Sequence, residues 1–163
     1  MSSRRQGRIL AFQTLYAWEA VKARFKSASE KQEILENLLT FSWLEDKKSE
    51  WLYEETQLFS RLLITGSIEN LEKIDDIIKS HLEHWNFSRV SRVDLAILRI
   101  SVYQLLFQRD MSAPIVISEA IAIAKIFGEE KSYGFVNGVL DGIRKTVENG
   151  EHEEEGAFQK RFA

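Results

Sequence analysis

Proline is nearly absent from this chain, since Pro114 is the one proline among 163 residues, and only eight glycines accompany it. Proline and glycine are the residues that most often end helices and form tight turns. Their scarcity favours helices and disfavours a turn-rich β fold. Apolar residues also recur at intervals of three and four along most of the chain, which indicates amphipathic helices. We therefore predict an all-α fold.

The apolar periodicity predicts about seven helices, at residues 4–25, 30–43, 51–65, 67–84, 92–107, 117–127 and 132–148. Ser29 and Ser67 are the predicted N-caps of the second and fourth helices. Gly66 is predicted to separate the third helix from the fourth. Gly128 is predicted to end the sixth helix in the left-handed conformation. Ser91-x-x-Asp94 approximates a capping box at the start of the fifth helix.

The fifth helix is apolar on most faces, as expected of the central helix of a packed core. We expect two small helical bundles that meet across it. They form one domain at residues 1–150, with subdomains at about 1–85 and 86–150. Asn149-Gly150 is predicted to end the last helix, and the acidic tail at residues 151–163 is predicted to be disordered.

The composition excludes several classes of site. Without cysteine the chain forms no disulfide or thiolate metal site, which suits a reducing cytosol, and we expect a cytoplasmic protein. No apolar run reaches about 18 residues, so we expect no membrane span. No nucleophile elbow, glycine-rich phosphate loop or zinc-protease motif is present, so we expect no enzyme and no cofactor. His81 and His84 share a helix side but lack a third ligand, so we expect no metal site.

Charge is distributed unevenly along the chain. The net charge is −3, yet the first 26 residues carry six basic residues against Glu19 alone, a balance of +5. Residues 151–155 carry four glutamates. This asymmetry indicates a polyanion-binding face on an acidic body.

The arginines at the start of the chain are the strongest candidates for phosphate contacts. Arg4 and Arg8 share a helix face, with Arg5 beside them, and guanidinium groups bind phosphates through a fixed fork of donors. The alternative is a solvated terminus without a ligand. Gly7 costs about 1 kcal/mol relative to alanine inside a helix, so we expect the first turn to fray until something binds.

Aromatic side chains beside a basic patch can stack on unpaired bases. Trp18 and Phe135 are equally candidates for the core, whereas the hydroxyls of Tyr16 and Tyr133 favour partial exposure. Ser132 is predicted to cap the seventh helix, whose free N–H groups suit a phosphate. Two structural expectations concern the same helix: a close helix approach at Asn137-Gly138, and an ion pair between Asp141 and Arg99.

Two blocks of the chain resemble the NusB family of transcription antitermination factors. The first is Arg4-Arg5-x-x-Arg8 followed by Gln13-x-Leu15-Tyr16-x-Trp18. The second includes Asp94-x-x-Ile97-Leu98-Arg99, Pro114, Glu119-Ala120, Phe127-Gly128 and Phe135-Val136-Asn137-Gly138-Val139-Leu140-Asp141. The chain departs from the family pattern at Gly7, where the family has alanine, and at Lys131, where the family usually has an acidic residue.

The resemblance implies a non-catalytic RNA-binding factor. Family members bind the single-stranded boxA element of nascent RNA together with NusE, a small-subunit ribosomal protein, in the RNA polymerase antitermination complex. The predicted RNA-binding residues are Arg4, Arg5, Arg8, Tyr16, Lys131, Ser132, Tyr133 and Phe135. We expect NusE to dock on the C-terminal half through Ser88 and Asp94, although Asp94 could instead cap the fifth helix. The sequence is compatible with either a monomer or a homodimer of the free protein.

Two other functions fit the residues. One is a helical protein-binding scaffold whose arginines bind an acidic partner. The other is an RNA-binding module related to that of RNA methyltransferases. For the second we expect no room, because the chain ends soon after the resemblance does and leaves too few residues for a cofactor-binding α/β domain.

Overall fold

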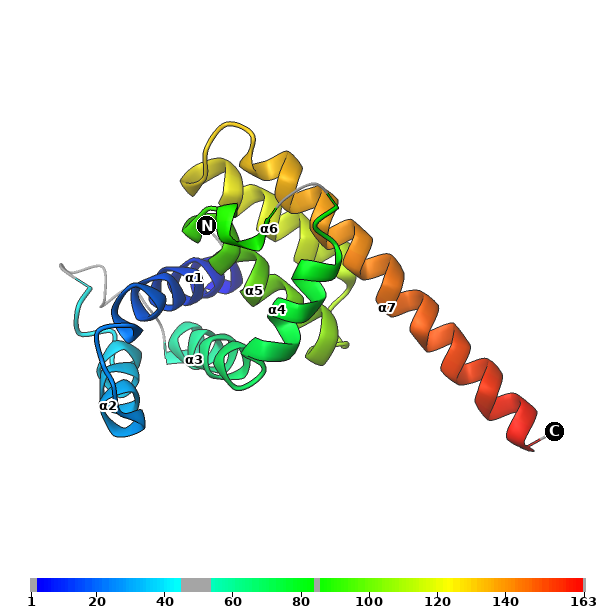
Figure 1. The fold of residues 1–163 in the computed structure, drawn as a ribbon, viewed down its shortest axis with the longest axis horizontal. Coiled ribbons are helices and arrows are strands. Elements are labelled where there is room, and N and C mark those ends of the chain that lie inside the picture. The colour runs from blue at the N-terminus through cyan, green and yellow to red at the C-terminus, as the bar shows by residue number, and fades with distance from the viewer. Residues whose placement is uncertain (1–2, 45–53, 84–85, 163) are drawn as a thin grey trace. The chain divides into compact units, whose positions relative to one another are not determined.

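The structure is a computed structural model that describes residues 3–44, 54–83 and 86–162, with the backbone alone for residues 151–162. Within these ranges it contains seven α-helices, one short 3-10 helix and no strand, which confirms the predicted all-α fold (Figure 1). The chain divides into two compact units, residues 1–69 and 70–163. The division lies one helix earlier than the subdomain boundary expected near residue 85.

The first unit contains α1 (Ser3–Lys22), α2 (Ala28–Leu39) and α3 (Glu54–Glu69). Helix α1 packs along α3 and also contacts α2 (Figure 1). The core between α1 and α3 is apolar and closed to solvent, with Leu15, Leu63 and Ile64 fully buried. Helix α2 begins two residues earlier than predicted, because Ser27 and not Ser29 is its N-cap: the Ser27 Oγ accepts a hydrogen bond from the Glu30 N–H at 3.2 Å.

Helix α3 continues through Gly66 and Ser67, so the predicted helix end at Gly66 and the predicted cap at Ser67 are wrong. Both residues are buried inside the helix. A glycine inside a helix costs about 1 kcal/mol, and burial of the neighbouring apolar side chains of α3 outweighs this cost. The next helix, α4 (Leu71–Ser80), follows Asn70, whose side chain makes no capping hydrogen bond.

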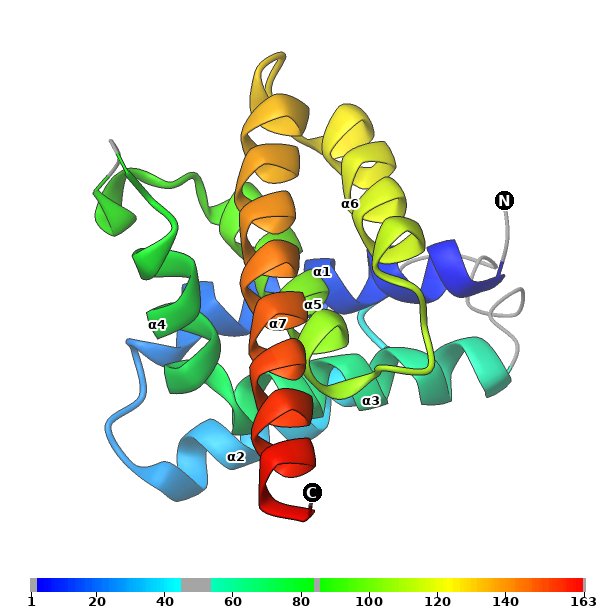
Figure 2. The same ribbon diagram turned by 90° about the vertical axis from the view of Figure 1, so that its right-hand side faces the viewer.

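The second unit contains α4, the 3-10 helix η2 (Phe87–Arg89), α5 (Arg92–Phe107), α6 (Ala113–Phe127) and α7 (Ser132–Phe162). Within this unit α5 packs against α4, α6 and α7, and α6 runs beside α7 (Figure 2). The bounds of α5 are the predicted ones. Its predicted N-cap is also confirmed, since the Ser91 Oγ accepts a hydrogen bond from the Asp94 N–H at 3.1 Å.

Helices α4 and α5 are joined by a buried ion pair. The Arg99 Nε and Nη2 each donate to one carboxylate oxygen of Asp75 at 2.8 Å, and Arg99 is 4% exposed. The predicted pair of Arg99 with Asp141 is therefore wrong. Asp141 pairs instead with Arg144 at 2.7 Å and Lys145 at 3.1 Å on its own helix. Residues three and four positions away are the nearest partners on a helix surface, which explains this choice.

Two helices of the second unit are longer than predicted. Helix α6 begins at Ala113, because a proline is tolerated in the first turn, where its missing N–H has no helical partner. Helix α7 continues through Asn149-Gly150, where its end was predicted, and reaches Phe162 across the segment for which disorder was predicted. A single glycine lowers helix propensity without ending the helix, and the glutamates on either side of it have high helix propensity. None of the described helices combines the length and apolar character of a membrane span.

The Asn137-Gly138 pair of α7 lies at the surface, so the predicted close helix approach there is wrong. Both residues are exposed. A Cβ built on Gly138 would meet no heavy atom of the structure within 4 Å. The glycine is therefore not required by packing.

Candidate nucleic-acid interface

Gly7 packs the arginine-rich start of α1 against α3. It is buried, and its carbonyl oxygen accepts a hydrogen bond from the Ser60 Oγ at 2.7 Å. A Cβ added at this position would lie 2.7 Å from the Phe59 Cδ1. The glycine thus permits a close approach of α1 to α3, and packing supports the start of α1 in addition to intrinsic propensity. Fraying of the first turn in the absence of a ligand stays a prediction.

The three arginines of α1 differ in their surroundings. The Arg4 guanidinium carbon lies 4.3 Å from the centre of the Phe59 ring, and that of Arg8 lies 5.5 Å from it. Arg4 is exposed, whereas Arg8 is only 5% exposed. Arg5 is partly exposed. Arg8 is therefore buried, whereas Arg4 and Arg5 keep contact with solvent.

Arg5 and Tyr16 lie on one side of α1. They are separated by three helical turns, about 16 Å along the axis. Tyr16 is 40% exposed, which confirms its predicted partial exposure. Trp18 belongs to the core instead, as its alternative interpretation expected, with 8% exposure and the Lys22 Nζ 4.7 Å from its ring centre. The first unit therefore presents an arginine and an aromatic ring along one exposed helix side.

The turn between α6 and α7 is tightly closed at Gly128. This glycine has φ −87°, so the predicted left-handed conformation is wrong. It is required for a different reason. A Cβ at this position would lie 2.6 Å from the Ser132 Cβ and 2.7 Å from the Ala124 carbonyl oxygen.

Ser132 holds this turn against α5. It is the first residue of α7. Its side chain was predicted to cap that helix, but it makes other hydrogen bonds. Its Oγ accepts a hydrogen bond from the Glu129 N–H at 3.0 Å and donates one to the Asp94 Oδ2 at 3.2 Å. Ser132 is buried, and the residues on either side of it, Lys131 and Tyr133, are exposed. Ser132 thus fixes the backbone from which these two side chains project.

Two further side chains complete this group at the start of α7. The Tyr133 ring is 45% exposed, which confirms its predicted partial exposure, and the Lys125 Nζ lies 5.1 Å from its centre. Phe135 is half-buried and so belongs fully neither to the core nor to the surface. The start of α7 therefore presents a second group of basic and aromatic side chains.

Asp94 is buried, with 7% exposure. Burial raises the pKa of its carboxyl above 3.8, the charge of Glu129 raises the pKa further, and the hydrogen bond from Ser132 opposes both. Its Oδ1 has no hydrogen-bond partner within the described residues. Ser88, the other residue expected to contact NusE, is exposed in η2. The burial of Asp94 disfavours direct contact with a partner, and its carboxylate accepts a hydrogen bond from Ser132 and does not cap α5.

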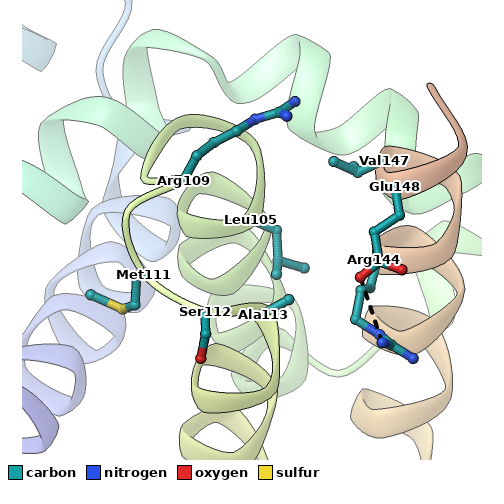
Figure 3. A pocket seen from close by; sticks show the side chains of 8 residues that line it. All are labelled: Leu105, Arg109, Met111, Ser112, Ala113, Arg144, Val147 and Glu148. Atoms are coloured by element: carbon teal, nitrogen blue, oxygen red, sulfur yellow. Dashed lines mark ion pairs between the residues drawn. The ribbon is translucent and has the colours of Figure 1, made fainter. Parts of the chain in front are cut away.

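A small pocket lies in the second unit, between the turn that joins α5 to α6 and the middle of α7 (Figure 3). Its volume is about 170 Å³, below the 300–1,000 Å³ or so of typical small-molecule sites. Arg144 and Glu148 form an ion pair of 3.6 Å at its rim. None of the residues predicted to bind RNA lines it.

The expected absence of a metal site rests on the two histidines. The His81 Nε2 lies 3.0 Å from the Thr146 Oγ1, in a hydrogen bond between α7 and the end of α4. His84 lies outside the described residues. Within the described ranges no three histidine, aspartate or glutamate side chains gather as a metal site would require.

The predicted RNA-binding residues thus form two groups. Arg4, Arg5, Arg8 and Tyr16 belong to α1 in the first unit, and Lys131, Ser132, Tyr133 and Phe135 belong to the turn before α7 and to α7 in the second. Their convergence on one RNA face stays a prediction. Phe59 was missed by the sequence analysis, because an apolar position of α3 carries no signal that its ring lies beneath two arginines of α1.

Arginines clustered at the start of one helix form a basic patch, which is the electrostatic feature expected of a nucleic-acid-binding surface. Comparison with known proteins gives the family. Residues 5–145 match the model of the NusB family, and the chain belongs to that family.

Relatives and solved structures agree with this assignment. The chain is 46% identical over 144 residues to the transcription antitermination protein NusB of Treponema pallidum, covering 88% of this chain and 94% of that protein. It is 38% identical to the protein of the same name from Borreliella burgdorferi, with the same coverage. The structure of T. maritima NusB is similar with a TM-score of 0.71 and 36% identity, over 89% of this chain and 92% of that one. A crystal structure of the antitermination factors NusB and NusE in complex with dsRNA is similar with a TM-score of 0.68 and 25% identity, over 90% and 98% of the two chains.

Proposed function

We propose that this chain is a non-catalytic bacterial transcription antitermination factor. It binds the single-stranded boxA element of nascent RNA together with NusE and promotes read-through of terminators by RNA polymerase in the cytoplasm, chiefly in ribosomal RNA operons. The observation that carries the proposal is the family match over residues 5–145, together with relatives named for transcription antitermination. The similar crystal structure that contains NusB, NusE and dsRNA supports binding of RNA and of NusE, and the single-stranded boxA element follows from the family resemblance.

The RNA site is proposed to use both groups of side chains. Arg4 and Arg5 contact phosphates, and Tyr16 stacks on a base, because these three side chains are at least partly exposed on α1. Lys131, Tyr133 and Phe135 form the second part of the site. Arg8 and Ser132 are buried and act on the RNA indirectly: Arg8 packs over Phe59, and Ser132 fixes the turn before α7.

The second unit is proposed to bind NusE. Ser88 lies exposed in η2, next to the start of α5. Asp94 does not contact NusE directly in this proposal. Its buried carboxylate accepts a hydrogen bond from Ser132 and so holds the start of α5 in place beneath the partner surface. The overall acidity of the chain suits a basic ribosomal protein, since complementary charge steers such a partner toward the surface.

Gel-shift titrations test the proposal directly. A short single-stranded boxA RNA is titrated with the full chain, with and without NusE, beside a scrambled strand of the same composition. We expect boxA to bind more tightly than the scrambled strand, and more tightly still when NusE is present. The logarithm of the binding constant should fall linearly with the logarithm of the salt concentration. Equal affinity for the two strands in every condition would contradict an RNA-reading factor and favour the protein-binding scaffold.

A further inference from the structure

The Phe59 ring has an unusual position for a core residue, since two arginines lie over it. Phe59 is 6% exposed, on the face of α3 that packs against α1. Arg4 and Arg8 come from successive turns of α1 and lie 4.3 Å and 5.5 Å from the ring centre. The ring faces of phenylalanine attract cations at such distances.

The ring is held in place from the side of α1. A Cβ on Gly7 would lie 2.7 Å from the Phe59 Cδ1, so only glycine leaves the ring its present position. The hydrogen bond from the Ser60 Oγ to the Gly7 carbonyl oxygen, at 2.7 Å, fixes the neighbouring backbone of α1 to α3. Gly7 therefore leaves the space that the Phe59 ring occupies.

Stacking on a ring and binding a phosphate use different parts of a guanidinium group. The ring takes the flat face of the group, and the N–H donors point outward in its plane. A stacked arginine therefore keeps its fork of donors for a phosphate. It also loses less side-chain freedom on binding, because the ring already restricts it.

A second arginine in the same unit lies over a phenylalanine and has a different role. The Arg61 guanidinium carbon lies 5.2 Å from the ring centre of Phe41, a residue that is 2% exposed. Its Nε donates to the Leu39 carbonyl oxygen at 3.0 Å, and its Nη2 donates to the Gln57 Oε1 at 3.3 Å. These bonds commit Arg61 to the connection between α2 and α3. Arg4 is exposed at the start of α1.

We propose that Phe59 is a positioning residue for RNA binding: its ring orders the Arg4 guanidinium for a phosphate contact, with Arg8 as the buried neighbour that shares the ring. This inference rests on the proposed RNA-binding function and assigns Phe59 a part in it. Phe59 itself does not touch the RNA.

The test combines two substitutions in the full chain. Phe59→Leu keeps an apolar side chain but removes the ring, and Arg4→Ala removes the cation. The affinity for single-stranded boxA RNA is measured by fluorescence anisotropy for the wild type, both single variants and the double variant. We expect Phe59→Leu to weaken binding by about threefold to tenfold, and to have less than about a twofold effect once Arg4 is absent. Equal losses in both backgrounds would overturn the inference, since Phe59 would then act through the fold and not through Arg4.

Two control variants separate positioning from stability. Phe59→Tyr keeps an aromatic ring and should restore affinity to within about twofold of the wild type. Phe41→Leu removes the ring beneath Arg61 and should lower the melting temperature without changing RNA affinity. A loss of RNA affinity in Phe41→Leu as large as that in Phe59→Leu would contradict a specific role of Phe59.

A readout without RNA distinguishes failure of this inference from failure of the proposed function. The NMR signal of the Arg4 Nε–H group should show a ring-current shift in the wild type and in Phe59→Tyr, and should lose it in Phe59→Leu. Absence of this shift in the wild type overturns the inference even if boxA RNA binds. Presence of the shift in a wild-type chain that binds no boxA RNA contradicts the proposed function, and the role of Phe59 in RNA binding with it.

Discussion

The three arginines at the start of α1 have different roles at the scale of single residues. Arg8 is buried over the Phe59 ring, and Arg4 lies exposed over the same ring. Arg5 is partly exposed on the side of α1 that also carries Tyr16. Sequence alone could predict the basic cluster and the exposure of Tyr16, because both depend on local residue type and spacing. It could not predict the burial of Arg8, which depends on a ring far away in the sequence.

Single alanine variants should separate these roles. Arg5→Ala should weaken binding to single-stranded boxA RNA and reduce the salt slope by about one unit, with little change in stability. Arg8→Ala should lower the free energy of unfolding by about 1–2 kcal/mol, because it removes buried packing and a cation over a ring. Urea unfolding and RNA titrations at several salt concentrations measure both. If Arg8→Ala were as stable as the wild type and Arg5→Ala were unfolded, the assignment of Arg8 to the fold and of Arg5 to RNA contact would be wrong.

Asp94 should make stability depend on pH. Its folded-state pKa is raised above 3.8 by burial, so the folded protein holds the proton more tightly than the unfolded chain does. This contribution to stability is fully present below the unfolded pKa and is lost as the pH rises through the raised folded pKa. Asp94→Asn, which keeps an acceptor for Ser132, should remove this part of the pH dependence. Urea unfolding from pH 3.5 to pH 7 measures it, and identical pH profiles for the two proteins would contradict the assignment.

At the scale of helices, local signals predicted α5 well and the junction of α3 with α4 poorly. Ser91 caps α5 through the hydrogen bond expected from its position, and the apolar run of the helix fixes its length. Gly66 and Ser67 carry the residue types of a helix end, yet both are buried inside α3. Tertiary burial overrides local propensity there, and no single sequence shows which glycine is buried.

Two glycines inside helices should respond oppositely to alanine. Gly7→Ala forces a Cβ to within 2.7 Å of the Phe59 ring and should lower the free energy of unfolding by about 1 kcal/mol, because overpacking exceeds the gain in helix propensity. Gly138→Ala meets no heavy atom of the structure within 4 Å and should raise it by about 0.5–1 kcal/mol. Thermal unfolding of the two variants gives the comparison. Stabilisation by Gly7→Ala as large as that by Gly138→Ala would show that α1 does not pack closely on Phe59.

At the scale of the whole molecule, the sequence predicted the family and the all-α class, because these depend on patterns spread over most of the chain. The candidate site could be predicted only in part. Exposed members such as Lys131 and Tyr133 follow from residue type, whereas the burial of Ser132 and Asp94 arises where the turn before α7 packs on the start of α5. The central claim also belongs to this scale, since antitermination requires RNA and partner binding by one chain.

Terminator read-through in vitro tests that claim most directly. Transcription by bacterial RNA polymerase with its other elongation factors and NusE is measured on a template that carries boxA upstream of a terminator, and on one with a scrambled boxA. Adding the full chain should increase read-through on the boxA template and leave the scrambled template unchanged, and Arg4→Ala/Arg5→Ala should reduce the increase, because both arginines are proposed to contact RNA phosphates. Read-through that does not change on the boxA template, or that rises equally on both templates, would contradict the account.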